Sequence, residues 1–417
     1  MPTQNDETVT SNIVKAGLIL RVLATGGLIA LLCAGAGALD LDRELSQYAH
    51  TAWRTQDGAF SGIPVAITQT SDGYLWIGTP DGLIRFDGVR FIPWSAPVGQ
   101  ALPRSDIRSL LGARDGSLWI GTGRGLARWK NGKLSTYPGT GDWVTDIAQD
   151  KDGTIWISRS QISDGKGPLC RILDRTAECY GGHEGISEPS AAHLVQDSPG
   201  SFWVGGYGGL FRWQSGAAKS YFEKEFKQPP TLIGVEALAA KADGSVWASI
   251  ERPGKPMQLQ QFVQGVWKAF QLPGLTGTDS NVSTLFVARD DTLWIGTGTK
   301  GVFRIRGTHV DHYSSAEGLS SDAVARIFED REGTVWVGTS KGIDSFRDVR
   351  VASFSIREGL TADSVSTVLA DRDGTVWIGN SGGLDFIKEN KLSAIRERHG
   401  FPGRDVTTLF EDHAGKL

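Results

Sequence analysis

The sequence predicts an all-β protein made of repeated four-stranded units, and three observations lead to this prediction. A phrase close to RDGTVWIGNSGGLDFI, which spans residues 372–387, occurs eight times in the 417 residues. The chain contains 54 Gly and 14 Trp beside only 2 Met, a composition that favours tight turns and large rigid packing units. After the first 38 residues, we find no long apolar stretch with a helical period and helix caps.

Each repeat carries a tryptophan at an equivalent position, and successive tryptophans are 37 to 47 residues apart. Around Trp119, four short apolar segments at 107–110, 118–120, 126–129 and 133–137 are separated by Asp-Gly, Gly-rich and Asn-Gly turns. Four strands per repeat, in a ring of repeats, predict a β-propeller. The eight tryptophans expected to pack between its blades are Trp76, Trp119, Trp156, Trp203, Trp247, Trp294, Trp336 and Trp377.

In the phrase LWIGT, Leu and Ile face one side of the strand, and Trp and Gly face the other. Both sides are apolar, as expected for a blade held between two neighbours. The glycine two residues after each tryptophan is expected to leave room for a large ring. Replacing Trp119 by Ala is predicted to lower the free energy of unfolding by about 3–5 kcal/mol.

Residues 45–348 hold seven repeats, which we predict to form the first ring. The segment RTQDGAF within residues 48–62 aligns with the ends of outer strands near 314–322 and 355–363, so residues 47–55 are predicted to complete the seventh blade. Residues 349–417 then begin a second, incomplete propeller whose last strands present an open, aggregation-prone edge. A single eight-bladed ring is the alternative. Residues 401–417 match the start of a ninth repeat, whose tryptophan is expected at position 418.

The first 38 residues predict a secretory signal peptide. Lys15 and Arg21 precede an apolar run at 22–33, and residues 36–38 form a small-x-small cleavage site. An uncleaved membrane anchor is the alternative, because residues 22–38 reach the lower limit for a span. Either reading places the body of the protein outside the cytoplasm; the resemblance described below implies the periplasmic face of a bacterial inner membrane.

A disulfide is predicted between Cys170 and Cys179, since Cys33 belongs to the signal peptide. In PLCRILDRTAECYG (168–181), a hairpin turn at Asp174 and Arg175 places the two cysteines opposite each other in a non-hydrogen-bonded pair. Export to an oxidising compartment favours the bond. The alternative is two buried thiols.

Several common chemistries are not expected. The charge balance of 43 Lys+Arg against 47 Asp+Glu argues against nucleic-acid binding. The GxGxxG match at 296–301 lies between two predicted strands and does not open a helix, so it does not predict a nucleotide site. The Asp-Gly turns lack the remaining ligands of a calcium loop, and the His residues show no metal-binding spacing. We therefore expect no cofactor, no metal site and no enzymatic activity in this chain.

Residues 67–91 (ITQTSDGYLWIGTPDGLIRFDGVRF), 120–133, 336–348 and 368–387 closely resemble the two-component regulator propeller repeat. The resemblance implies two successive seven-bladed propellers that form the extracytoplasmic sensor of bacterial histidine kinases, or in some relatives of diguanylate cyclases. A β-sandwich, a membrane helix and an output domain normally follow, and a homodimer is expected in the full-length parent. None of these parts is recognised here, so we expect a chain truncated before its output domains, which would meet the membrane only through them.

Loops on one face of a propeller tolerate variation and often carry function. Cations and aromatic residues in these loops could bind an unidentified small molecule or oligosaccharide. A secreted carbohydrate-binding or carbohydrate-active propeller and a protein-binding scaffold are the alternatives. The candidate ligand-binding residues are Arg124, Tyr207, Lys300 and Lys341 in loops after second strands, and Trp94, Trp143 and His183 between blades.

Overall fold

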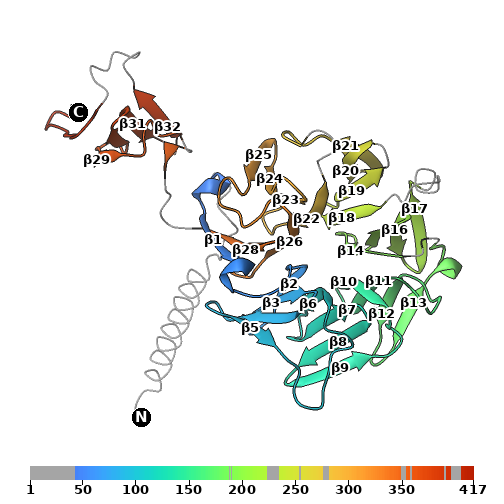
Figure 1. The fold of residues 1–417 in the computed structure, drawn as a ribbon. Helices are drawn as coiled ribbons and strands as arrows, with labels where there is room; N and C mark the ends of the chain where they lie inside the picture. The colour runs from blue at the N-terminus through green and yellow to red at the C-terminus, as the bar shows by residue number, and fades with distance from the viewer. Residues whose placement is uncertain are drawn as a thin grey trace, which may run out of the picture.

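The computed structural model describes residues 43–186, 188, 190–222, 234–252, 255–275, 281–348, 354–356, 359–388, 391–395 and 405–417. Within these residues the strands form eight four-stranded antiparallel sheets. Seven sheets form a closed ring, and the eighth lies beside it (Figure 1). The predicted seven-bladed β-propeller of four-stranded blades is confirmed, and one further four-stranded sheet follows it where the start of a second propeller was predicted.

In each blade the strands pair in order from the axis of the ring outward. The innermost strand of each blade contacts that of the next, and the seventh contacts the first. The innermost strands are β2 (Ala66–Gln69), β6 (Ile107–Gly112), β10 (Trp143–Gln149), β14 (His193–Gln196), β18 (Val235–Ala240), β22 (Val282–Val287) and β26 (Val324–Glu329). The second strands are β3 (Leu75–Thr79), β7 (Leu118–Thr122), β11 (Ile155–Ser160), β15 (Phe202–Gly206), β19 (Val246–Arg252), β23 (Leu293–Thr297) and β27 (Val335–Thr339).

The outer half of each blade consists of a third and a fourth strand. The third strands are β4 (Gly82–Phe86), β8 (Gly125–Lys130), β12 (Leu169–Ile172), β16 (Gly209–Gln214), β20 (Lys255–Val263), β24 (Val302–Arg306) and β28 (Gly342–Arg347). The fourth strands of blades one to six are β5 (Phe91–Trp94), β9 (Lys133–Tyr137), β13 (Ala177–Tyr180), β17 (Ala217–Tyr221), β21 (Val266–Phe270) and β25 (His309–Tyr313). A short 3-10 helix, η3 (Gly182–Glu184), follows β13.

The ring closes through a strand from the N-terminal part of the chain. Strand β1 (Ala49–Arg54) pairs antiparallel with β28 and forms the outermost strand of the seventh blade. The 3-10 helices η1 (Leu45–Gln47) and η2 (Thr55–Asp57) flank β1. In Figure 1 this blue strand lies beside the orange strands of the seventh blade. Opening the ring at this blade therefore requires breaking a complete strand ladder, which would expose the edge of β28.

Each repeated tryptophan follows a tight turn, and in five repeats a side chain of this turn accepts the indole N–H. In four repeats an aspartate lies six residues before the tryptophan and accepts the indole N–H at 2.7–3.0 Å. In the fourth blade, for example, Asp197 accepts both this N–H from Trp203 and the backbone N–H of Ser201. The turn thus reverses the chain and satisfies a buried polar group. The seven repeated tryptophans of the ring, at the motif position, are at most 9% exposed.

In six repeats a glycine lies two residues after the tryptophan, and its role differs from the predicted one. A Cβ added to Gly121 would lie 2.8 Å from Cγ1 of Val144, and one added to Gly296 would lie 2.6 Å from Cγ1 of Val324. Both valines belong to the innermost strand of the next blade. The prediction of room for a large ring was wrong, because the space admits a β-branched side chain that packs the next blade closely.

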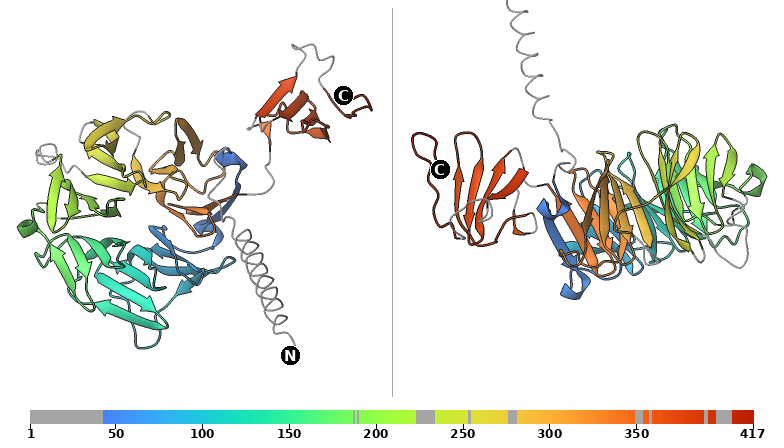
Figure 2. Two further views of the ribbon diagram at one scale, coloured as in Figure 1. Left: turned by 180° about the vertical axis from the view of Figure 1, so that it is seen from behind. Right: turned by 90° about the horizontal axis from the view of Figure 1, so that it is seen from above.

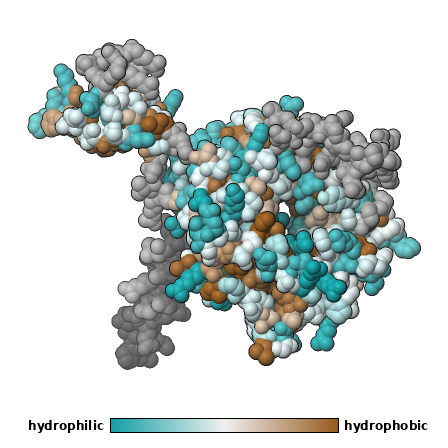
Figure 3. Space-filling model, viewed as in Figure 1, coloured by the Kyte–Doolittle hydropathy of each residue, from teal (hydrophilic) through white to brown (hydrophobic). Residues whose placement is uncertain are grey.

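The eighth sheet contains β29 (Val365–Ala370), β30 (Val376–Asn380), β31 (Gly383–Lys388) and β32 (Lys391–Ile395). It lies at the side of the ring in both views of Figure 2. Its Val365 and Val368 are 44% and 60% exposed, and Trp377 is only half-buried. Figure 3 shows hydrophobic residues among hydrophilic ones on its surface. This sheet therefore has the strand order of a blade without the burial that neighbouring blades give in the ring.

Residues after the eighth sheet approach it as a next blade would. The Val406 N–H donates to the carbonyl of Asn380 at 3.1 Å, and a Cβ on Gly379 would meet Val406 Cγ1 at 2.6 Å. Asp412 to Lys416 then form the same backbone turn as the other Asp-x-x-Gly segments. Residues 405–417 contain no strand, but these contacts are those expected at the start of a ninth repeat.

The predicted Cys170–Cys179 disulfide is present. The two residues face each other across β12 and β13, with their Cα atoms 4.0 Å apart. The predicted signal peptide (1–38), with Cys33, lies outside the described residues. Among the described residues, no helix has the length and hydropathy needed to cross a membrane.

Candidate functional site

A cavity of about 600 Å³ lies at the axis of the ring. Its wall is formed mainly by the innermost strands of blades three to seven. One end is lined by Trp143, the first residue of β10, and Ser160, the last residue of β11, and by Ser190 and Tyr207, which lie in the connections before β14 and after β15. This is the face on which the ligand site was predicted. The volume is in the range that proteins use for small-molecule ligands.

The innermost strand of each blade contributes one residue to a layer of seven residues around the axis of the ring. Three of these seven residues have ionisable side chains in the cavity wall. Each of the seven residues lies ten positions before a repeated tryptophan and pairs across the sheet with the Gly or Ser two positions after that tryptophan. The seven residues, in blade order, are Ala66, Ser109, Asp146, His193, Ala237, Thr284 and Arg326. At this position of the repeat, the side chain is therefore small or carries a hydroxyl group in four blades, and it is ionisable in the other three. Asp146, His193 and Arg326 all line the cavity.

A β-bulge determines where Asp146 points. The register between β10 and β11 shifts between Val144 and Asp146, so these two residues face opposite sides of the blade. Val144 packs toward Gly121 of the preceding blade. The Asp146 carboxylate instead reaches the following blade, where it accepts the Leu194 N–H at 3.2 Å. A bulge at the same place in β26 precedes Arg326.

Arg326 reaches from the seventh blade toward the third and fourth blades. Its Nη2 lies 4.0 Å from Asp146 Oδ1, and its side chain is 38% exposed. Burial raises the pKa of Asp146 above its ordinary value, although Arg326 and the N–H groups of Leu194 and Ile147 act in the opposite direction. Burial and the charge of Arg326 lower the pKa of His193 to about 4. At neutral pH the layer therefore contains a guanidinium beside a neutral imidazole.

The mouth of the cavity carries a second guanidinium. Arg108 lies over the Trp143 ring at 4.1 Å from its centroid and donates to Asp106 at 3.2 Å. Arg104 also pairs with Asp106, at 3.1 Å, so two arginines share one carboxylate. Tyr207 is 53% exposed at the same end. Of these two arginines, Arg108 is the one that lines the cavity.

Of the seven candidate ligand-binding residues, the structure brings together Trp143 and Tyr207 in the cavity wall. Sequence reasoning did not find Arg108, Asp146, His193 or Arg326. Aligning the repeats on their tryptophans and comparing the tenth preceding residue would have found three of these four. Arg108 has no such signal, since only the ring brings it over the Trp143 side chain.

The remaining five candidates lie elsewhere. Trp94 packs against two other tryptophans between the first and second blades. Lys300 lines a separate, smaller pocket beside the sixth blade. Arg124, His183 and Lys341 are exposed and do not line the axial cavity.

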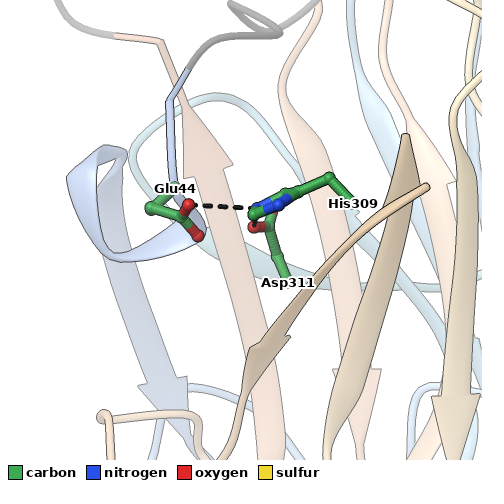
Figure 4. A group of neighbouring side chains, drawn as sticks. All are labelled: Glu44, His309 and Asp311. Carbon is green, nitrogen blue, oxygen red and sulfur yellow. Dashed lines mark hydrogen bonds and ion pairs between the residues drawn. The ribbon is translucent and has the colours of Figure 1, made fainter. Parts of the chain in front are cut away.

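Glu44, His309 and Asp311 form a cluster of the kind that can hold a metal ion (Figure 4). His309 Nε2 lies 3.0 Å from Glu44 and 2.7 Å from Asp311. Asp311 also pairs with Arg304 and with Arg306, and two guanidinium groups beside it oppose the binding of a cation. We interpret the cluster as an ion-pair network that fastens the segment before β1 to the sixth blade.

The family model described as two component regulator propeller matches residues 58–81, 101–124, 138–158, 318–341 and 359–382. Each matched segment contains one of the repeated tryptophans and the turn that precedes it. A search of the curated proteins finds no match to the chain.

Two similar solved structures are extracellular domains from B. thetaiotaomicron. One belongs to the hybrid two component system BT3049, with a TM-score of 0.65 and 20% identity, over 88% of this chain and 51% of that one. The other, BT4673, is described as a one component system, with a TM-score of 0.58 and 18% identity, over 88% and 50%. The chain thus spans about half the length of these structures.

A streptogramin B lyase structure is also similar, with a TM-score of 0.57 and 15% identity over 73% of this chain and 99% of that one. At such identities a likeness shows the propeller fold alone, because one fold hosts many functions. The repeats are more specific, since they combine the turn, the tryptophan and the following glycine in one segment. The chain therefore carries two component regulator propeller repeats on a propeller fold.

Proposed function

We propose that the chain is the extracytoplasmic signal-input region of a two-component sensor histidine kinase. The axial cavity is the observation that carries this proposal. It has the volume of a small-molecule site, and one repeat position supplies three different ionisable side chains to its wall. The repeat family and the likeness to extracellular domains of such systems support the same role.

In this proposal the cavity binds a ligand without converting it. The Asp146 carboxylate accepts the N–H groups of Ile147 and Leu194, and no hydrogen bond between Asp146 and His193 is present among the described residues. His193 is therefore not oriented by a carboxylate as a general base usually is. A ligand that binds one conformation of the ring more tightly than another increases the fraction of receptor molecules in that conformation. This change in population is the signal.

The eighth sheet begins a second propeller, which carries the signal toward the membrane. Later parts of the parent protein supply the membrane helix, and a homodimer is the form that signals. The coding sequence after codon 417 tests this proposal. We expect the remaining repeats, a β-sandwich, a membrane helix and a histidine kinase module.

If a diguanylate cyclase module follows instead, the sensor role proposed for this chain stands, and only the proposed histidine kinase output is wrong. A reading frame that continues into a secreted polysaccharide-degrading domain, without a membrane helix, would contradict the proposal.

A further inference from the structure

We propose that the axial cavity binds a small organic acid through its carboxylate, with Arg326 as the principal partner. This inference rests on the proposed receptor function and names the class of its ligand. It follows from the hydrogen bonding of Arg326, from the charges around the cavity and from the residues at the mouth.

The Arg326 guanidinium is available to a ligand. Its distance to Asp146, 4.0 Å, is longer than a hydrogen bond. In the part of the chain that the structure describes, the Arg326 side chain makes no hydrogen bond to another protein group. A guanidinium presents five N–H donors in a planar fork, which matches the two oxygens of a carboxylate. An arginine that faces a cavity with these donors unused is suited to bind an anion there.

Asp146 does not neutralise Arg326 completely. Its two oxygens accept backbone N–H groups, at 3.0 Å from Ile147 and 3.2 Å from Leu194, so hydrogen bonds within its own surroundings hold the carboxylate. Its raised pKa reflects the cost of keeping this charge in a buried place. A ligand carboxylate on the open side of the guanidinium would supply the hydrogen bonds that Asp146 does not.

The other charges that face the cavity favour an anion. His193 is neutral at physiological pH, because its pKa is about 4, and its ring can donate one hydrogen bond to a ligand oxygen. At the mouth, Arg104 and Arg108 share Asp106. The ionisable side chains that line the cavity are therefore two guanidiniums, Arg108 and Arg326, one carboxylate, Asp146, and the neutral imidazole of His193. One additional negative charge balances the described charges, which favours a monocarboxylate over a neutral ligand or a dianion.

The residues at the mouth of the cavity indicate the chemistry of the rest of the ligand, apart from its carboxylate. Trp143 and Tyr207 present aromatic surface there, and Ser160 and Ser190 present hydroxyl groups. A ring-shaped or flat body can contact the aromatic surface while its polar groups bind the serines. The ligand class is therefore a small monocarboxylate with a ring-shaped body, whose carboxylate enters first and whose body remains at the mouth.

Titration calorimetry with matched pairs of compounds tests this inference on the purified chain. The pairs differ only in the carboxylate: glucuronate and glucose, 4-hydroxybenzoate and 4-hydroxybenzyl alcohol, phenylacetate and 2-phenylethanol. We expect at least one acid to bind and its neutral counterpart to bind at least about tenfold more weakly. The variant Arg326→Gln should weaken binding of the acid by about tenfold or more. Asp146→Asn should strengthen it, because the variant removes an opposing charge.

Lys341→Gln is the matched control, since it removes an exposed cation that lies on the same face but outside the cavity. It should leave the affinity unchanged. Circular dichroism and the unfolding midpoint identify variants that fail to fold. Equal binding of the neutral compounds, or binding that survives Arg326→Gln in a folded variant, overturns the organic-acid inference and leaves the receptor proposal intact. The absence of binding by every acid at about 10 mM also overturns it.

Discussion

Replacing Trp203 by Ala should cost more stability than most single substitutions in this ring. The side chain is fully buried, its indole N–H donates to Asp197 at 3.0 Å, and it packs against Phe262 at a centroid distance of 4.8 Å. Loss of a buried tryptophan typically costs about 3–5 kcal/mol, and a lost hydrogen bond to a buried carboxylate adds about 1 kcal/mol. We therefore expect a loss of about 4–6 kcal/mol in the free energy of unfolding.

Guanidinium unfolding followed by far-ultraviolet circular dichroism measures this change without relying on the fluorescence of the altered residue. Trp377→Ala is the matched control, because it removes the same motif residue where it is only half-buried, in the sheet outside the ring. It should leave the unfolding of the ring unchanged. A loss below about 1 kcal/mol for Trp203→Ala, or an equal effect of both variants on the ring, would refute the packing role of the repeated tryptophan.

Three further predictions concern pH, the disulfide and ring closure. The pKa of His193 is lowered to about 4, so its contribution to stability is present above pH 6.5 and is lost as the pH falls toward 4. Between pH 7.5 and 5, the wild type should therefore lose about 2 kcal/mol relative to His193→Gln in denaturant titrations, and a constant difference between the two proteins would contradict this. Replacing Cys170 and Cys179 together by Ser should cost about 2–3 kcal/mol, because the bond closes a short loop. Two reactive thiols in the unfolded, unreduced wild-type protein would show that the bond is absent. Deleting residues 43–54 removes β1 and exposes β28, so light scattering after gel filtration should show aggregates, whereas a stable monomer would contradict ring closure by this strand.

Much of the fold could be predicted from the sequence because each blade repeats the same local signals. The Asp-x-x-Gly turn, the tryptophan and the glycine recur at nearly constant spacing, and they define strand number and order directly. The role of the glycine could not be predicted in this way. It depends on a contact between Gly121 and Val144, which lie in different blades and meet only when the ring is assembled.

The candidate site could be predicted less well, because the sequence indicates ligand contacts in variable loops, whereas three of the cavity's ionisable residues lie in innermost strands. Trp143 and Tyr207 were found since aromatic residues in such loops are conspicuous. Asp146, His193 and Arg326 lie in innermost strands, where a single polar residue resembles ordinary variation in a repeat. Only closure of the ring brings Arg326 of the seventh blade close to Asp146 of the third.

Amide hydrogen exchange with and without a bound carboxylate tests most directly whether the axial cavity receives the signal. The probe is the acid that binds most tightly among glucuronate, 4-hydroxybenzoate and phenylacetate. We predict increased protection at the starts of β10, β14 and β26, which carry Asp146, His193 and Arg326. Protection confined to the eighth sheet, or to the separate pocket beside Lys300, would contradict the central claim, because the ligand would then bind away from the axis of the ring.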